Sequence, residues 1–200
     1  DALGELFAAA RSRLPGSGPV AEVRQSAFDD FARRGLPHRR IEEWKYTDLR
    51  ALLRDIAPLA AGPDQADLTR AAKAIKSLGI DNTQKLVLVD GVFAPQLSDV
   101  TTLEAGVHLR TLREVLEDGG NKVRADLLKT NAASDAMISL NAALATDGVV
   151  IDVAEGVTLT KPIHIVHVAT DSGSSLVTRS LLKLAKGARA TLVENFVAAE

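Results

Sequence analysis

Cysteine is absent from the 200 residues of this chain. Its absence excludes a disulfide framework, a thiolate nucleophile and any thiolate-ligated zinc or iron–sulfur site among these residues. The composition is otherwise that of a folded globular protein, with 46% hydrophobic and 25% charged residues. A chain of this size can bury a sizeable core, so we expect it to fold with neither a disulfide nor a metal.

A surplus of either charge sign is also missing. The 24 basic and 26 acidic residues are interspersed and leave a formal net charge of −2, which creates no field that would attract nucleic acid or an anionic membrane. No stretch approaches the roughly 18 apolar residues that a membrane helix needs. Residues 1–14 also lack the pattern of a secretory signal. We therefore expect a cytoplasmic protein that binds neither nucleic acid nor a membrane.

Sequence motifs for common catalytic chemistry are absent as well. No G-x-x-x-x-G-K-[ST] motif exists, and Gly119-Gly120 lies between two expected helices, which is not the setting of a phosphate-binding loop. No G-x-S-x-G motif appears, and Ser172–Ser175 has the composition of a flexible turn. We therefore expect no enzyme activity, and no catalytic, cofactor-binding or metal-ligating residue in this chain.

Histidine offers no convincing metal site. His164 and His167 are the closest pair, but their spacing on a strand directs the two side chains to opposite faces of the sheet. We expect one ring to point outward and the other to be hydrogen-bonded against the core or a neighbouring coil. His38 and His108 are isolated, and we expect both to be exposed.

The first 80 residues follow helical periodicity, and we predict a helical N-terminal domain over residues 1–80. Apolar residues recur at helical spacing in four stretches, each with a start or stop signal. The stretches are residues 1–13, 19–34, 48–56 and 65–78. Thr47 and Asp64 are the expected N-caps of the last two, and Gly35 and Gly79 are expected to end the second and the fourth.

Residues 81–134 predict a mixed segment that connects two domains. Strand-forming residues flank Asp90-Gly91, which is a strong signal for a two-residue hairpin turn. Residues 111–114 match a capping box that opens a short helix to about Glu117. A further helical run is expected from 122 to 129.

Residues 135–200 change from one expected helix, at 135–145, to an almost continuous series of strands. Within them IDVAEGV at 151–157 aligns residue by residue with LKLAKGA at 182–188. Repeated strand–turn units of this length predict a solenoid, in which stacked coils share one core. Because only about two coils are visible before Glu200, we expect an open edge that further coils, another chain or self-association would cover, and a longer protein.

One string stands out for its specificity. The segment GLPHRRIEEWKYTDL at 35–49 resembles a signature near the N-terminus of the SufB/SufD family of iron–sulfur cluster assembly proteins, in its SufD branch. Residues 139–194 are similar to the start of that family's β-helix core. The resemblance implies an α+β fold, with a helical N-terminal domain followed by the first coils of a right-handed parallel β-helix. The motif residues, which we interpret as structural or interface positions, are Arg40, Glu42, Glu43, Trp44, Lys45 and Tyr46.

Within this motif, Glu42 and Glu43 adjoin three cationic residues, so a local ion-pair network explains them better than catalytic carboxylates do. The cationic residues are Arg39, Arg40 and Lys45. Trp44 and Tyr46 are the one Trp and the one Tyr of the chain. Such aromatic side chains suit a domain core or a protein interface, and we favour the core.

The resemblance also implies a function. It predicts a non-catalytic scaffold subunit of the SUF iron–sulfur cluster assembly complex, with a SufB-like protein and the SufC ATPase as partners and no cofactor in these residues. The family's proposed ligand positions would lie beyond Glu200. Two alternatives stay open: the SufB branch, and a β-helix carbohydrate-active enzyme. The enzyme would need clustered charges on one strand face, whereas Asp152, Lys183 and Glu194 are scattered along the sequence.

Overall fold

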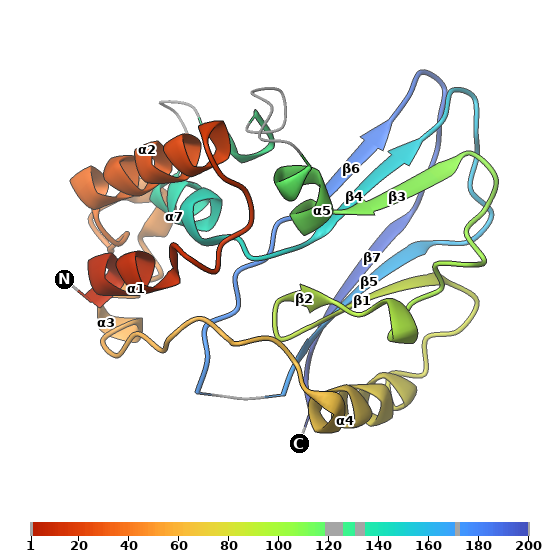
Figure 1. Cartoon of the computed structure of the whole chain (residues 1–200), viewed down its shortest axis with the longest axis horizontal. Coiled ribbons are helices and arrows are strands. Elements are labelled where there is room, and N and C mark those ends of the chain that lie inside the picture. The colour runs from red at the N-terminus through yellow and green to blue at the C-terminus, as the bar shows by residue number, and fades with distance from the viewer. Residues whose placement is uncertain (1, 119–125, 131–134, 171–172, 200) are drawn as a thin grey trace. The chain divides into compact units, whose positions relative to one another are not determined.

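The computed structural model of this chain describes residues 2–118, 126–130, 135–170 and 173–199. It is an α+β structure, as the sequence predicts (Figure 1). Its residues form two compact units, each made of two separate stretches of chain. The helical unit comprises Asp1–Leu59 and Arg113–Ala145, and the sheet unit comprises Ala60–Leu112 and Thr146–Glu200. The three consecutive domains 1–80, 81–134 and 135–200 stay a prediction.

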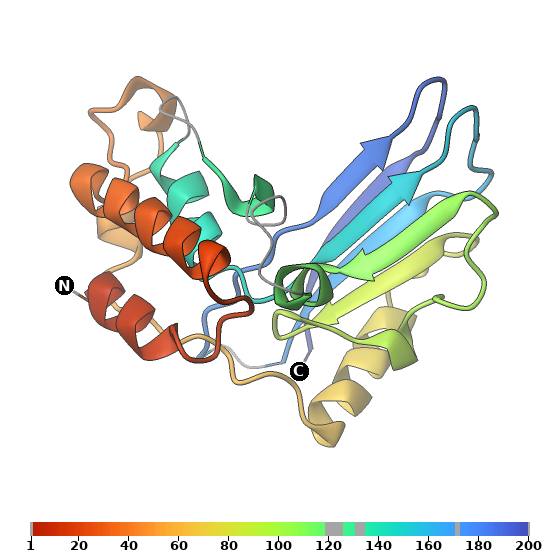
Figure 2. The same ribbon diagram turned by 45° about the horizontal axis from the view of Figure 1, so that its top comes forward.

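The helical unit is built around one long helix. Its helices are α1 (Ala2–Ala10), α2 (Pro19–Arg34), α3 (Leu49–Leu52), α5 (Leu112–Glu117, whose first residue belongs to the sheet unit) and α7 (Ala136–Leu144). The short 3-10 helices η1 (Glu42–Trp44) and η3 (Asp126–Leu128) complete it. Helix α2 packs along α7 (Figure 2). Phe7 of α1 stacks on Phe28 of α2, with ring centroids 4.4 Å apart.

Local signals account for most helix boundaries. Pro19 opens α2 and Gly35 ends it, with the Gly35 N–H bonded to the Phe31 carbonyl. Asp64 caps α4 (Gln65–Lys76) through a full capping box with Asp67, as expected. The prediction that Thr47 caps α3 is wrong.

Asp48 caps α3 instead. Its carboxylate accepts hydrogen bonds from the N–H groups of Arg50 and Ala51, at 3.1 and 3.3 Å. Aspartate ranks above threonine as an N-cap, and here it stands one position nearer to the helix. Helix α3 ends at Leu52, short of the expected Ile56. Half of the helical run expected at 122–129 lies outside the described residues, and in the other half Asp126–Leu128 form the 3-10 helix η3.

The sheet unit contains two sheets. One has the strand order β2-β1-β5-β7 and the other β3-β4-β6. The strands are β1 (Gln84–Val89), β2 (Val92–Phe93), β3 (Val107–Thr111), β4 (Val149–Val153), β5 (Ile163–Ala169), β6 (Leu181–Leu184) and β7 (Leu192–Ala198). The short 3-10 helix η2 (Pro95–Leu97) follows β2. The hairpin predicted at Asp90-Gly91 is confirmed as the β1–β2 turn. Both turn residues have positive φ, 48° and 78°, as a tight hairpin of this kind requires.

The sequence repeat corresponds to parallel strand pairing. β4 and β6 pair in parallel with Ile151 opposite Leu182, the same two residues that begin the aligned segments. The bridges Asp147–Thr178 and Thr158–Arg189 keep the same offset on either side of this pair. β5 also pairs in parallel with both β1 and β7. The aligned segments are therefore stacked neighbours in space.

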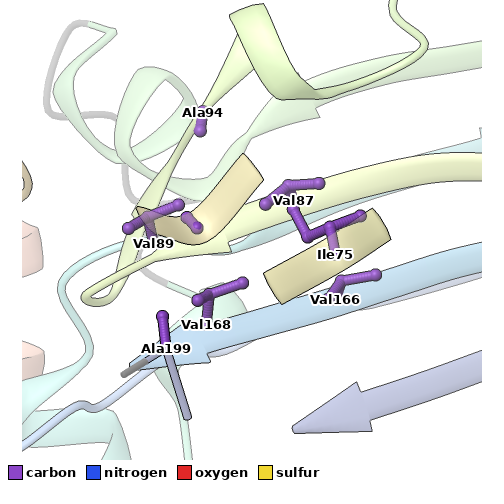
Figure 3. Close-up of a cluster of buried hydrophobic side chains, with 8 residues drawn as sticks. Ile75, Val87, Val89, Ala94, Val166, Val168 and Ala199 are labelled. Atoms are coloured by element: carbon purple, nitrogen blue, oxygen red, sulfur yellow. The ribbon is translucent and has the colours of Figure 1, made fainter. Parts of the chain in front are cut away.

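Two apolar clusters hold the sheet unit together. An inner cluster joins the facing sides of the two sheets. An outer cluster lies under α4 on the other side of β1 and β5 (Figure 3). The inner cluster consists of Leu86, Leu88, Val149, Ile151, Val153, Ile163 and Ile165. The outer cluster consists of Ala71, Ile75, Val87, Val89, Ala94, Val166, Val168 and Ala199. Alternation along β1 and β5 thus divides their side chains between the two clusters.

Gly148 offers a direct test of this stacking. A Cβ atom at this position would lie 1.8 Å from the backbone carbonyl oxygen of Arg179, on the neighbouring strand segment. Backbone cannot give way as a flexible side chain can, so we expect Gly148→Ala to lower the free energy of unfolding by about 1–3 kcal/mol or more. Urea unfolding followed by circular dichroism measures the change.

Gly156→Ala is the matched control. A Cβ atom there meets nothing within 4 Å, but the residue has a φ of +73°. Its cost is therefore confined to the left-handed backbone, about 1 kcal/mol. If the two variants unfold at the same urea concentration, the close approach at Gly148 does not matter for stability.

Candidate functional site

The most specific sequence motif forms a closed loop in the helical unit. Residues 37–49, called the motif loop below, run through a series of turns that include η1. The Leu49 N–H donates to the Pro37 carbonyl at 3.0 Å and brings the two ends of the loop together. Inside it, Trp44 N–H bonds to the Ile41 carbonyl and Thr47 N–H to the Trp44 carbonyl. Most of its backbone geometry is therefore local.

Trp44 attaches the motif loop to α7. Its indole Nε1 donates to the Asp135 carboxylate at 2.6 Å. Asp135 is also the N-cap of α7, since its other oxygen accepts from the Met137 N–H at 2.7 Å. The ring is half-buried. Trp44 is therefore neither a core residue nor a fully exposed one. It lies at the margin of the helical unit and is held there by its hydrogen bond to Asp135.

The other motif residues lie on the surface. Tyr46 is 90% exposed, so the expectation of a core position is wrong for this side chain. Lys45 pairs with Glu42 at 2.8 Å and lies 5.3 Å from the centre of the Tyr46 ring. The ion-pair network expected around Glu42 and Glu43 is confirmed for this pair alone among the residues that the structure describes. Exposed pairs of this kind contribute roughly 0–1 kcal/mol.

The motif loop and Arg50 line a cavity that the sequence analysis did not predict. A cavity of about 480 Å³ is lined by His38, Arg39, Arg40, Asp48 and Arg50. The Arg50 Nε donates to the Leu36 carbonyl at 3.1 Å, and the His38 Nδ1 accepts from the Arg40 N–H at 3.2 Å. His38, expected to be exposed, is half-buried. The cavity therefore has a cationic lining.

A buried guanidinium supports the helical unit on which this site rests. Arg24 of α2 is 3% exposed and donates to four backbone carbonyls at distances of 3.0 to 3.3 Å. These carbonyls belong to Pro15, Ala142, Ala143 and Ala145, the last three at the C-terminal end of α7. Burial lowers the pKa of Arg24 to about 10, with the charge of Arg113 acting in the same direction. The group remains a cation at neutral pH and caps α7.

Asp30 forms a second link between α2 and α7. It accepts a hydrogen bond of 2.7 Å from the fully buried Ser139 hydroxyl and pairs with Arg33 and Arg34. The Ser139 hydrogen bond, followed by the charges of Arg34 and Arg33, lowers the pKa of Asp30 below its usual value. Asp30 therefore stays ionised in its place.

The histidines of β5 have structural hydrogen-bond partners. His164 is fully buried, with Nε2 2.8 Å from the Asn195 amide oxygen. His167 Nε2 lies 2.8 Å from Glu194, and its ring stacks on Phe196 at 4.6 Å. The expected opposite faces are confirmed, because His164 lies on the face of the outer cluster and His167 on that of the inner cluster. The expectation that one ring points outward is wrong, since the His167 side chain is only 11% exposed. No group of three or more metal-binding side chains occurs within the described ranges.

On the outer face of the β3-β4-β6 sheet, one polar or charged side chain from each strand lies in a row across the strands. His108 is exposed, as expected, and lies opposite Asp152, which lies opposite Lys183. Asp152 and Lys183, treated above as scattered, approach to 3.7 Å across β4 and β6, whereas Glu194 pairs elsewhere with His167. Both partners of the Asp152–Lys183 pair are about half exposed, at 50% and 53% of their side chains. This is the geometry of a surface ion pair.

Comparison with known proteins agrees with the motif. Residues 3–165 match the family model described as the SufBD protein N-terminal region. This match covers well over half of the chain and defines a class of protein: one that carries a SufBD-type N-terminal region. The chain belongs to the SufBD family, and the resemblance inferred from residues 35–49 is confirmed.

Two curated relatives are similar over most of the chain. The iron–sulfur cluster assembly SufBD family protein of Synechocystis sp. is 27% identical over 179 residues, which is 88% of this chain and 39% of the relative. The iron–sulfur cluster assembly protein SufD of Escherichia coli is 31% identical over 181 residues, 86% of this chain and 38% of the relative. The chain thus spans about two fifths of the length of these relatives. No helix in the described ranges is long and apolar enough to cross a membrane.

The Trp44–Asp135 hydrogen bond predicts a measurable coupling. We expect Trp44→Phe to lower the free energy of unfolding by about 1–2 kcal/mol, because it removes the indole donor while keeping an aromatic ring. Asp135→Ala should lose this bond and the α7 cap together, about 1–3 kcal/mol. A double-mutant cycle by urea unfolding should show a coupling of about 1 kcal/mol, whereas strictly additive effects would mean that the bond does not contribute.

Arg24 predicts a larger loss. Arg24→Met keeps much of the aliphatic length but leaves four carbonyls without their donor, so we expect a loss of about 2–4 kcal/mol. Arg33→Met is the control, since the Arg33 side chain is 75% exposed and its ion pair with Asp30 should contribute less than about 1 kcal/mol. Thermal unfolding by circular dichroism compares the two. Equal melting temperatures would contradict the capping role of Arg24.

Proposed function

We propose that this chain is the N-terminal part of a SufD-like, non-catalytic scaffold subunit in iron–sulfur cluster assembly. The observation that carries the proposal is its similarity to Escherichia coli SufD over 86% of the chain, at 31% identity. A match to 86% of the chain extends over most of both the helical unit and the sheet unit. A SufB-like protein and a SufC-like ATPase are the proposed partners, and the cytoplasm is the proposed location.

The stacked strands support a β-helix as the scaffold. Parallel pairs β4–β6 and β5–β7 repeat one strand–turn unit directly above another, with turns at Gly156 and Gly187 in equivalent positions of the two units. In a solenoid each coil buries the inward side chains of its neighbour. We propose that these strands are the first coils of a right-handed parallel β-helix.

The outermost strands supply a surface for further pairing. β6 and β7 each have a strand neighbour on one side only among the described residues. Their inward residues are more exposed than the matching residues of the preceding coil: Ile163 is 1% exposed, whereas its β7 partner Leu192 is 45% exposed and Phe196 is 75% exposed. Such an edge offers main-chain hydrogen bonds and apolar area, worth about 25 cal/mol per Å² buried, to further coils or to a partner chain.

The charged row on the second sheet favours the enzyme alternative only weakly. A carbohydrate-active β-helix would need acidic and basic groups gathered in a cleft on one strand face. Asp152 and Lys183 do lie on one face, but they are half exposed and neutralise each other. Lys183→Ala would abolish a lyase or hydrolase activity, and it should leave scaffold function unchanged.

A pull-down tests the proposal. The complete gene product, tagged at its N-terminus, is recovered from an extract of its own organism, its partners are identified by mass spectrometry and its iron is assayed. We expect an ABC-type ATPase and a second SufBD-family protein. Residues 1–200 alone serve as a control that locates the contacts. A monomeric, intact gene product that recovers neither partner would overturn the scaffold proposal.

A further inference from the structure

The cationic cavity lined by the motif loop and Arg50 has unused hydrogen-bond donors. Three guanidinium groups and one imidazole line it, against a single carboxylate, Asp48. That carboxylate already accepts two backbone N–H groups as the cap of α3. Cationic groups therefore exceed acidic ones, and the one acidic group is committed to the fold.

Arg50 is positioned for a ligand. Its Nε is bonded to the Leu36 carbonyl, which orients the guanidinium, while its two Nη atoms have no partner in the described part of the chain. The exposed side chains of Arg39 and Arg40 likewise make no hydrogen bond or ion pair with any described residue. Guanidinium groups of this kind bind carboxylates through paired, parallel hydrogen bonds.

The lining indicates the kind of ligand. Small-molecule and coenzyme sites are mostly apolar and contain a few polar groups. This cavity is lined by three arginines, one histidine and one aspartate, and no Phe, Tyr, Trp or aliphatic residue is among them. A ligand with several carboxylates along its length fits such a lining.

The composition of the same segment points to a protein. Large apolar side chains are exposed throughout the same segment, with Tyr46 at 90% and Leu52 at 69%. Ile41 and Leu53 are exposed as well, at 37% and 36%. Exposed aromatic side chains next to arginines are characteristic of protein interfaces and of their energetic centres.

We propose that residues 38–53 form a docking surface for an acidic segment of a partner protein. Carboxylates of the segment enter the cavity and bind Arg39, Arg40 and Arg50, and an apolar side chain of the segment covers Tyr46. The inference goes beyond the scaffold proposal and does not depend on it, because it follows from this surface alone.

A defined peptide tests the surface. The complete gene product is titrated into a fluorescein-labelled peptide of glutamates with two central leucines, and fluorescence anisotropy gives the affinity. We expect Arg39→Gln/Arg40→Gln to weaken binding about tenfold or more, since truncating interfacial charge partners has effects of at least this size. Tyr46→Ala should weaken it about fivefold or more. All three positions are exposed, so the variants should fold normally, which circular dichroism verifies.

The controls separate this site from general charge attraction. Arg11→Gln/Lys76→Gln removes the same charge from exposed positions elsewhere and should leave the affinity unchanged. A loss as large as that of the Arg39/Arg40 variant would overturn the proposal. The proposal also fails if a peptide with glutamine in place of glutamate binds equally well, or if no binding occurs at low salt. Displacement of the peptide by inorganic phosphate, with no effect of Tyr46→Ala, would assign the cavity to a small oxyanion instead.

Discussion

The helical unit depends on a cation buried without a carboxylate partner. Arg24 is stable in that position because its donors satisfy the carbonyls that α7 leaves unpaired at its C-terminal end, together with one from the turn before α2. At the other end of α7, Asp135 caps the helix and accepts the Trp44 indole. Helix α7 is therefore fixed at both ends by polar groups from other segments. The motif loop, and with it the cationic cavity, takes its position from that second contact.

The sheet unit is instead stabilised by the stacking of a repeated strand–turn unit. Equivalent residues of the two aligned segments become neighbours, and the close approach of the backbones at Gly148 shows how little space separates the stacked segments. Alternation along β1 and β5 divides their side chains between the inner cluster and the α4-covered outer cluster. In the described residues β7 has a strand neighbour on one side only, and its inward side chains Leu192 and Phe196 are exposed.

The two proposed interaction surfaces differ in chemistry. The edge at β6 and β7 offers main-chain groups and apolar area, which suits strand addition. The surface at residues 38–53 offers guanidinium groups and exposed aromatic and aliphatic side chains, which suits an acidic segment. They lie on different compact units.

Short-range signals in the sequence were enough to predict most of the helices and strands, and the motif at 35–49 was enough to indicate the family. The capping box at Asp64, the hairpin turn at Asp90-Gly91 and the pairing of the two aligned segments each depend on residues close in the chain or on direct repetition, and each is confirmed. The predictions for the α3 cap and for Tyr46 were wrong, because neighbouring candidates compete locally and burial is decided by distant packing. Arg24 stands on the apolar face of α2, yet its role could not be foreseen, since its carbonyl partners on α7 lie 118 to 121 residues away. Only the tertiary structure decided which polar groups meet, because hydrogen bonds between distant residues follow from how the helices pack and not from any local pattern.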